Sequence, residues 1–428
     1  MTRSPGEQAS PRAGAVRAFR GRVLTPIPSA SARVPELRYL EDGVITIDAE
    51  GRITSVGPFS KSVPRPVLDL HPRLITPGFA DAHVHFPQHR AVGSATGPLL
   101  EWLERTVFPE EMRFSDEAYA RAVAEEFFGR MRAFGTLVAG VYASSSKIAA
   151  RVAFEAAGDA GLLGQIGLVL MDRGAPDGLL VPRGRAMEDL AELLDFIGDR
   201  RDLRLAVTPR FALSCSRELM RDAAGFASGH GLFVQTHLSE NDGEIAATRA
   251  AFPEAPDYFG VYEAAGLAGE RSLFAHAIHL SPSEWERVAA TRSCLVHCPD
   301  SNLFLGSGRM RLREALRRGI KVALGSDVAA GRTLDMRRIA ASAYDTALAE
   351  KEPVSPEELF SLATWCGADA LGFGAETGAI TPGRRADLAV IDLPEHARKL
   401  ADVIGHTLFA SDSTPVVRTF SAGRASGG

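Results

Sequence analysis

Two histidines, His83 and His85, are separated by a single residue at the end of an apolar run. In an extended strand, residues i and i+2 point to the same side, so these two imidazoles leave the strand end together and can chelate a metal ion. Three further side chains of metal-ligating type, on His237, His276 and Asp327, also follow short apolar runs. Together these residues predict a metal centre built from histidine and carboxylate ligands.

Histidine and carboxylate ligands that leave one position for water are the usual arrangement of hydrolytic zinc sites. The metal lowers the pKa of its bound water to about 7, which makes hydroxide available at neutral pH. Asp327 can both contact the metal and accept the proton of that water. Its alternative role is to cap the helix that follows it, where aspartate is favoured.

Three further polar side chains lie close in sequence to these candidates or at another strand end. Glu240 follows His237 by three residues, and a carboxylate there can move a proton from water to a leaving group; the alternative is an exposed loop glutamate. His279 follows His276 by three residues, a spacing that puts the two on opposite faces of a strand, so that one is a ligand and the other packs or supports the site. His297 closes another strand, and a structural role is favoured for it over contact with substrate.

The elements that must position these residues alternate short apolar strands with amphipathic segments. Strands are expected at residues 74–85, 136–142, 165–171, 203–211, 232–238, 273–279, 293–297 and 321–325. Amphipathic segments are expected at 116–134, 186–197, 218–229 and 282–290. Parallel strands need helical crossovers, so this alternation predicts an α/β fold with a TIM-like (β/α)8 barrel. The candidate residues stand at the carboxyl ends of the strands, where active sites of such barrels lie.

The two ends of the chain have a different pattern. Short strands are expected at 16–26, 43–56, 378–392 and 416–422. We expect them to form a small β-sandwich domain from residues 15–75 and 376–428, beside a barrel over residues 76–375; the alternative is a pair of β arms. Residues 1–14 are polar and rich in Pro, Ser and Gly, which predicts a disordered tail.

Composition excludes several classes of protein. The 428 residues are 45% hydrophobic and 24% charged, with a net charge of −5, which is typical of a soluble globular protein. No basic cluster suggests nucleic-acid binding, and no signal peptide or membrane-spanning apolar run is evident, so a cytoplasmic location is expected. The four cysteines form no Cys-x-x-Cys pair, which argues against a zinc finger and against a cysteine-ligated deaminase zinc site.

Several segments resemble the amidohydrolase superfamily and, within it, the guanine deaminase family. The segments are 77–88 (PGFADAHVHFPQ), 99–103 (LLEWL), 108–110 (FPE), 209–216 (PRFALSCS), 236–241 (THLSEN) and 297–308 (HCPDSNLFLGSG). The resemblance extends from residue 16 to residue 424. It implies zinc-dependent hydrolytic deamination of guanine to xanthine and ammonia, by a protein that forms a homodimer.

The resemblance also implies roles for individual residues. One zinc ion, with iron as the alternative metal, would be held by His83, His85, His237, His276 and Asp327. Glu240 would be the proton shuttle, and the purine would be held by Gln88, Arg210 and Phe211, with His279 beside the site. Pro209 and Arg210 stand where two-metal members of the superfamily carry a modified lysine, which favours a single metal.

The residue types assigned to the purine suit guanine. Arginine pairs well with the O6 and N7 acceptors of guanine, glutamine both donates and accepts, and phenylalanine offers a face for stacking. The chain departs from the family in the loop 326–332, which is more basic than its counterpart and leaves the role of Arg332 open. Alternative substrates for the same chemistry are 8-oxoguanine, a pterin or an amino-triazine. A binding barrel without activity is disfavoured, because the ligand set and Glu240 are complete.

Overall fold

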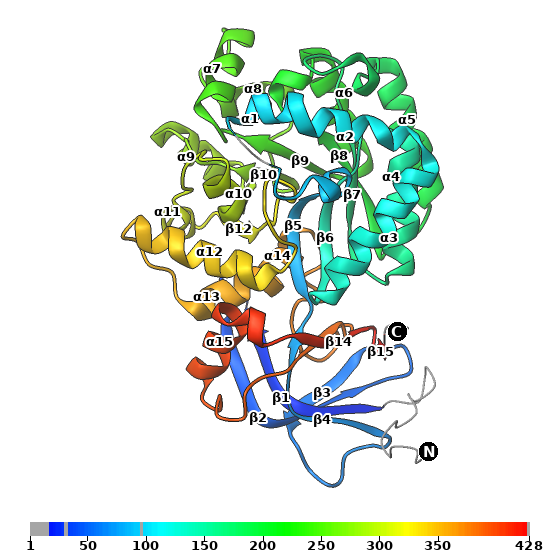
Figure 1. Cartoon of the computed structure of the whole chain (residues 1–428), viewed down its shortest axis with the longest axis vertical. Coiled ribbons are helices and arrows are strands. Elements are labelled where there is room, and N and C mark those ends of the chain that lie inside the picture. The colour runs from blue at the N-terminus through cyan, green and yellow to red at the C-terminus, as the bar shows by residue number, and fades with distance from the viewer. Residues whose placement is uncertain (1–16, 30–32, 95–96, 426–428) are drawn as a thin grey trace, which may run out of the picture.

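The chain forms an eight-stranded barrel and a separate mixed sheet, drawn one above the other in Figure 1. The computed structural model describes residues 17–29, 33–94 and 97–425. The tail predicted over residues 1–14 lies outside these residues. No helix among the described residues combines the length and the apolar character needed to cross a membrane.

Eight parallel strands make the barrel, and neighbours in sequence are neighbours in space. They are β5 (Phe79–His85), β6 (Thr136–Tyr142), β7 (Leu163–Leu170), β8 (Leu203–Pro209), β9 (Phe233–Leu238), β10 (Ser272–His276), β11 (Cys294–His297) and β12 (Lys321–Leu324). Residues just after β12 close the ring onto β5, since the Asp327 N–H donates to the His83 carbonyl (2.8 Å) and the His85 N–H donates to the Val328 carbonyl (3.1 Å). The predicted barrel is therefore confirmed.

Helices surround the barrel. The helices that connect successive strands are α3 (Glu117–Ala133), α4 (Lys147–Asp159), α5 (Arg183–Ile197), α6 (Arg217–His230), α8 (Tyr258–Ala265), α9 (Pro282–Ala290) and α11 (Leu312–Arg317), and α12 (Met336–Ala349) follows the last strand. Their first turns carry the expected caps: the Asp116 carboxylate accepts two backbone N–H groups at the start of α3, and Ser281 and Glu284 form a capping box on α9.

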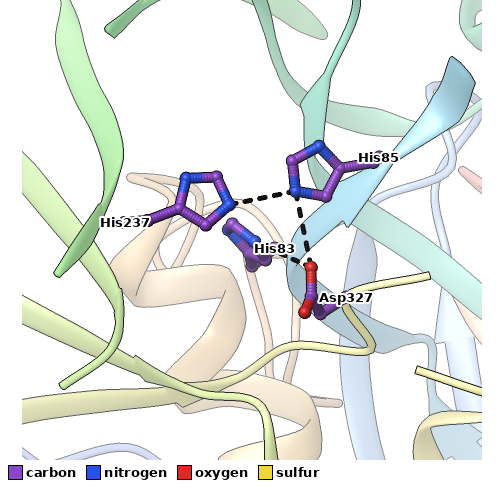
Figure 2. Close-up of side chains that lie close together, drawn as sticks. All are labelled: His83, His85, His237 and Asp327. Atoms are coloured by element: carbon purple, nitrogen blue, oxygen red, sulfur yellow. Dashed lines mark hydrogen bonds and ion pairs between the residues drawn. The ribbon is translucent and has the colours of Figure 1, made fainter. Parts of the chain in front are cut away.

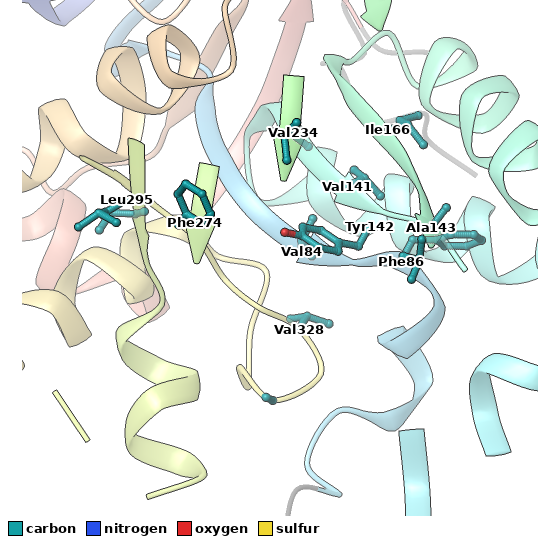
Figure 3. Packing of buried hydrophobic residues seen from close by; sticks show 14 of the residues in the cluster. Val84, Phe86, Val141, Tyr142, Ala143, Ile166, Val234, Phe274, Leu295 and Val328 are labelled. Carbon is teal, nitrogen blue, oxygen red and sulfur yellow. The ribbon is translucent and has the colours of Figure 1, made fainter. Parts of the chain in front are cut away.

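The apolar faces of strands and helices meet in one large core, part of which is drawn in Figure 3. Strand register puts Val84 beside Val141 and Val141 beside Ile166, and Phe274 beside Leu295. A second apolar cluster joins small strand residues to Leu371 and Phe373, which follow α14 (Gly367–Ala370). The middle of each strand is thus occupied by core residues, and the candidate functional residues lie at the carboxyl ends of the strands, as expected for this architecture.

The terminal segments form the second sheet. Its strands, in spatial order, are β15 (Arg424–Ala425), β14 (Val416–Ser421), β13 (Leu388–Ile391), β4 (Val67–Pro77), β1 (Ala18–Ile27), β2 (Glu36–Ile47) and β3 (Ile53–Pro58). This confirms a β domain built from both ends of the chain, with its strands in one hydrogen-bonded sheet. We propose that the β domain comprises residues 15–75 and 376–428 and that the barrel domain comprises residues 76–375.

Strand β13 contributes side chains alternately to the two cores. Leu388 and Val390 belong to the core of the terminal sheet, whereas Ala389 and Ile391 belong to the core of the barrel. Successive side chains of a strand point to opposite faces, so one strand serves both cores. Helices α13 (Pro356–Ser361) and α15 (Leu400–Phe409) lie between α12 of the barrel and the terminal sheet in Figure 1.

The expectation of one continuous strand over residues 74–85 is wrong, because β4 and β5 belong to different sheets. The chain changes sheet at Gly78. Its N–H donates to the Asp387 carbonyl (3.0 Å) beside the terminal sheet, whereas the next N–H, of Phe79, donates to the Gly135 carbonyl (2.9 Å) at the barrel. A Cβ on residue 78 would lie 2.7 Å from the Leu137 side chain, so only glycine fits this crossing.

Candidate active site

Four of the predicted ligands meet at the carboxyl end of the barrel (Figure 2). His83 and His85 end β5, His237 lies in β9, and Asp327 follows β12. Each offers one ligand atom, and these atoms all lie within 4.8 Å of one another. The His83 Nε2 is 3.1 Å and the His85 Nε2 3.4 Å from Oδ1 of Asp327, and the Nε2 atoms of His85 and His237 are 3.1 Å apart.

His276, the last residue of β10, joins the same group. Its Nε2 lies 3.5 Å from Oε2 of Glu240 and 3.8 Å from Oδ2 of Asp327. This nitrogen is buried and has no hydrogen-bond partner among the described residues, although buried polar atoms normally have one. An unpartnered imidazole nitrogen facing carboxylates, next to two converging imidazoles, fits a cation held between them. The donor set is therefore suited to a divalent metal ion.

The charge states of these residues suit metal ligation. Burial lowers the pKa of His83 to about 4 and that of His237 well below its ordinary value, so both imidazoles are neutral at neutral pH. Burial acts to raise the pKa of Asp327, but hydrogen bonds from His83 and His85 outweigh it and hold that pKa well below its ordinary value. Neutral imidazoles and an ionised carboxylate are the forms that bind metals.

The geometry of β5 and β12 has local causes. The register of β5 against β6 shifts between Asp81 and Val84, which is the kind of irregularity that re-aims side chains beside active sites. The buried Asp81 carboxylate accepts the N–H (2.9 Å) and hydroxyl (2.5 Å) of Ser326 and so ties the two strand ends together. A Cβ on Gly325 would lie 2.8 Å from Cβ of His83, so glycine leaves the room that this ligand needs.

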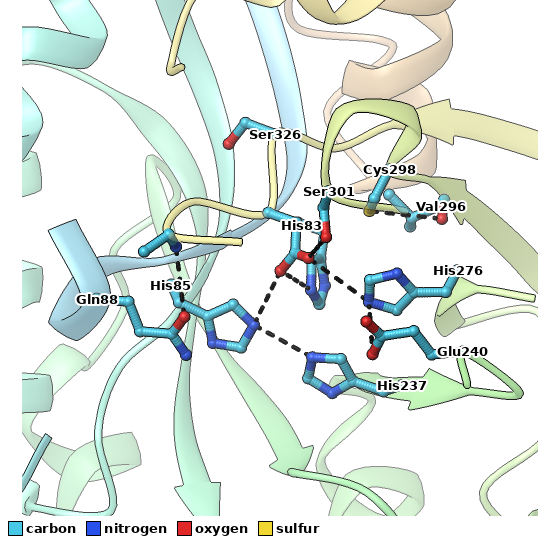
Figure 4. Close-up of polar contacts among 12 residues, drawn as sticks. His83, His85, Gln88, His237, Glu240, His276, Val296, Cys298, Ser301 and Ser326 are labelled. Atoms are coloured by element: carbon cyan, nitrogen blue, oxygen red, sulfur yellow. Dashed lines mark hydrogen bonds and ion pairs between the residues drawn. The ribbon is translucent and has the colours of Figure 1, made fainter. Parts of the chain in front are cut away.

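Further contacts orient the ligand side chains, and that of Ser301 is drawn in Figure 4. The Nδ1 of His237 lies 2.6 Å from the Arg210 carbonyl oxygen, and Nδ1 of His276 lies 2.8 Å from Oδ1 of Asn302. The Ser301 hydroxyl donates to Oδ2 of Asp327 (2.5 Å). Such outer contacts fix ring orientation and raise the basicity of the ligand.

The chain also turns sharply at the site. His276 and Asp327 have φ angles of 71° and 50°, a left-handed conformation that non-glycine residues rarely adopt. Ser239, between His237 and Glu240, has a φ of 48°. Strained backbone of this kind gathers at functional sites, where the surrounding structure holds it in place.

A cavity opens over the ligands, and its empty space, which includes open solvent, is about 400 Å³. Metal-ligand candidates and other polar or apolar residues line it together: His85, Gln88, Leu99, Trp102, Leu103, Arg210, Phe211, His237, Glu240, Glu244, Asp327 and Ala330. One wall comes from a helical segment made of α1 (Leu99–Trp102), a π-helical turn (Leu103–Val107) and α2 (Phe108–Met112). Pro109 stands early in α2, and π-turns of this kind are frequent at functional sites.

Glu240 is buried and lines the cavity. Burial, then the charges of Asp327 and Glu244, raises the pKa of its carboxyl well above the ordinary value. A carboxyl that keeps its proton near neutral pH can act as a general acid. Its backbone N–H donates to Oε2 of Glu244 (3.0 Å), which anchors the segment that carries it.

The sequence pattern of the Amidohydrolase family matches residues 74–425. The chain belongs to the amidohydrolase family. Among its relatives is the guanine deaminase of Escherichia coli (strain K12), 34% identical over 91% of this chain and 92% of that protein. The human guanine deaminase is 30% identical over 82% of this chain and 79% of that protein.

Solved structures of amidohydrolase relatives have the same fold. The E. coli guanine deaminase superposes with a TM-score of 0.91 at 33% identity, covering 96% of this chain and 99% of that one. The guanine deaminase from C. acetobutylicum with bound guanine superposes with a TM-score of 0.88 at 29% identity, covering 96% and 99%.

Most residues predicted for the amidohydrolase site are brought together. The five ligand candidates converge, and Glu240, Gln88, Arg210 and Phe211 line the cavity above them. His279 is not among the described residues lining the cavity; its Nε2 lies 2.8 Å from the Ser307 carbonyl oxygen. Strand alternation does not apply to it, because β10 ends at His276 and Ala277 already has a φ of 48°.

Two other residues, whose roles the sequence left open, are also not among the described residues that line the cavity. Arg332 forms an ion pair with Asp300 and also donates its backbone N–H to that carboxylate (2.7 Å). Neither ring nitrogen of His297 has a hydrogen-bond partner among the described residues, and burial lowers its pKa to about 3.

The sequence did not indicate a role for several residues that lie at the site. Ser301 and Asn302 lie in the quoted segment 297–308, whose pattern gave no role for either. Cys298 lies near His83 and His276, but burial raises its pKa well above the ordinary value, which disfavours the thiolate that metals bind. Glu111, on α2, contacts both Gln88 and Arg210, and no sequence signal indicated it.

Proposed function

We propose that this protein catalyses the hydrolytic deamination of guanine to xanthine and ammonia. The observation that carries the proposal is a single cavity whose wall includes both ligand candidates, such as His237 and Asp327, and the residues suited to a purine, such as Gln88 and Arg210. The guanine deaminases among the relatives support the same substrate, over nearly the whole of both chains.

We propose one zinc ion, with iron as the alternative, held by His83, His85, His237, His276 and Asp327. The unpartnered Nε2 of His276 and the convergence of the imidazoles support this ligand set. Arg210 at the end of β8, in the position of a modified lysine, supports a single ion. Bound there, the metal lowers the pKa of a water molecule to about 7 and so provides a nucleophile at neutral pH.

Two carboxyl groups move the protons in this proposal. Asp327, oriented by Ser301 and by the two histidines of β5, accepts a proton from the water that attacks C2 of the purine. Glu240 donates its proton to the ring nitrogen beside C2, and the proton taken up by Asp327 passes to the departing amine. Glu240 regains a proton from the C2 hydroxyl as the carbonyl of xanthine forms. The raised pKa of Glu240 and the lowered pKa of Asp327 support this division into acid and base.

The purine is held from the other side of the cavity. Arg210 donates to the O6 and N7 edge of the base, and Gln88 offers both a donor and an acceptor. Phe211, 6% exposed at the end of β8, presents an apolar face for stacking. A homodimer and a cytoplasmic location stay predictions from the sequence.

A substrate panel tests the proposal. Ammonia release by the zinc-loaded protein is measured with guanine, 8-oxoguanine, adenine, cytosine, isoxanthopterin and ammeline under one set of conditions. We expect fast release from guanine, with xanthine as the product. Release from another amine but not from guanine would overturn the assigned substrate while leaving the metal site in place.

The variant Arg210→Ala tests the recognition of the purine. Loss of a charged donor to the substrate should raise the KM for guanine by about 10- to 100-fold, with a smaller change in kcat. An unchanged KM would remove Arg210 from the substrate-binding residues. Metal content serves as the control, because the Arg210 carbonyl also contacts His237 and the substitution preserves that backbone group.

A further inference from the structure

Glu111 is a buried carboxylate behind the cavity wall. It lies on α2, its side chain is 2% exposed, and it is not among the described residues that line the cavity. Oε1 accepts a hydrogen bond from Nε2 of Gln88 (3.0 Å), and Oε2 accepts one from Nη1 of Arg210 (2.5 Å). One carboxylate thus contacts both polar residues that face the purine.

The contact with Gln88 sets the direction of its amide. A carboxylate only accepts hydrogen bonds, so the amide nitrogen of Gln88 must face Glu111 and its oxygen must face the other way. That oxygen accepts the backbone N–H of Ala329 (3.3 Å), a contact of Gln88 that Figure 4 draws as a dashed line. One N–H and one lone pair of Gln88 remain for a ligand, in a fixed orientation.

The contact with Arg210 sets the charge of the wall. The guanidinium is always protonated and its side chain is 4% exposed, and Glu111 is its ion-pair partner within the described part of the chain. A buried charge without a partner is costly and attracts anions. With Glu111 in place, Gln88, Arg210 and Glu111 together carry no net charge.

We propose that Glu111 is a specificity-determining positioning residue, which makes this wall select a neutral purine over an anionic one. The inference rests on the proposed function for the identity of the ligand, since it assumes that Gln88 and Arg210 face a purine. Glu111 acts through these two side chains and does not touch the substrate itself.

The test compares two purines of different charge. Binding of hypoxanthine, which is neutral near pH 7, and of urate, which is an anion, is measured by isothermal titration calorimetry on metal-loaded wild type and Glu111→Gln. The variant keeps the volume of the side chain, but its amide nitrogen must face Gln88 or Arg210 and no negative charge remains. We expect the preference for hypoxanthine over urate to fall by at least about tenfold, because one partner of a buried charge pair is lost.

Two further variants separate this role from a structural one. Glu111→Asp keeps the charge and should restore most of the discrimination. Glu110→Gln is the matched control, since Glu110 lies next on the same helix but binds Tyr119 and Arg113 instead, and it should behave as wild type. A structural defect alone would weaken both purines in parallel.

The binding experiment distinguishes failure of the role of Glu111 from failure of the proposed function. An unchanged ratio of urate to hypoxanthine affinity in a folded, metal-loaded Glu111→Gln protein would overturn the role of Glu111. A wild type that binds both purines but releases no ammonia from guanine would contradict the proposed function alone, because the binding ratio does not depend on turnover. A wild type that binds neither purine would contradict both.

Discussion

The hydroxyl of Ser301 donates a hydrogen bond of 2.5 Å to Oδ2 of Asp327, the carboxylate whose other oxygen faces His83 and His85. Ser301 lies on the short helix α10 (Pro299–Phe304), whose next residue, Asn302, contacts His276 and whose preceding residue, Asp300, holds Arg332. Two consecutive residues of this helix thus orient two ligand candidates, and the residue before them anchors the loop that follows β12.

Ser301→Ala should reduce activity without unfolding the protein. Loss of the hydroxyl leaves Asp327 free to rotate away from the position in which it accepts a proton, and removal of such outer contacts costs about 10- to 100-fold in activity or metal affinity. The measurement is kcat together with metal content, with Ser283→Ala on the surface of α9 as the control and Ser301→Thr as the rescue. Full activity of Ser301→Ala would show that Asp327 is oriented without it.

Glu240→Gln should keep the metal and lose turnover. Glutamine fills the same space but cannot deliver a proton, and loss of a general acid typically costs about 100- to 10,000-fold in rate. Steady-state kinetics with guanine, accompanied by metal analysis of the same sample, provide the check. Turnover equal to that of wild type would refute the shuttle role of Glu240.

Arg332→Ala should leave substrate choice almost unaltered. Its side chain is 54% exposed and is directed to Asp300, and an exposed ion pair contributes under ~1 kcal/mol, equivalent to about fivefold in KM. The backbone N–H of residue 332 still donates to Asp300 in the variant, so the loop keeps one anchor. A change in the ranking of purines across the substrate panel would instead place Arg332 in contact with the ligand.

His297 should make the protein sensitive to acid. Its pKa is about 3 in the folded state because the ring is buried, against an unfolded value of 6.5, so the unfolded chain binds a proton that the folded chain does not. Stability from this residue is complete above pH 6.5 and is lost as the pH falls toward 3, by about 2 kcal/mol at pH 5.

The corresponding measurement is the free energy of unfolding of wild type and His297→Phe between pH 7 and pH 5. We expect the variant to lose less stability over this range, whatever its packing cost at pH 7. Parallel curves for the two proteins would contradict the buried neutral state of His297.

Much of the fold and of the site could be predicted from local pattern. His83 and His237 end apolar runs, and the two-residue period of a strand and the common edge of a parallel barrel are enough to bring such residues together. The β domain was also predictable, but the sheet change at Gly78 was not, because it depends on the approach of Leu137 from another strand.

What could not be predicted depends on distant contacts. Glu111 and Arg210 are 99 residues apart, and no spacing rule links a short helix to a strand end at that distance. The strand expected over residues 273–279 ends at His276, because the chain turns with positive φ at His276 and Ala277. Ser301 and Asn302 lie within the segment 297–308 that resembles the family, but their hydrogen-bond partners became evident only from the structure.

Metal-dependent conversion of guanine tests the central claim most directly. Xanthine and ammonia are measured from the same reaction, with protein stripped by a chelator and then titrated with zinc. We predict that stripping abolishes turnover, that one zinc per chain restores it, and that xanthine and ammonia appear in equal amounts. Ammonia release that survives complete removal of the metal, or a zinc-loaded protein that leaves guanine unchanged, would contradict the account.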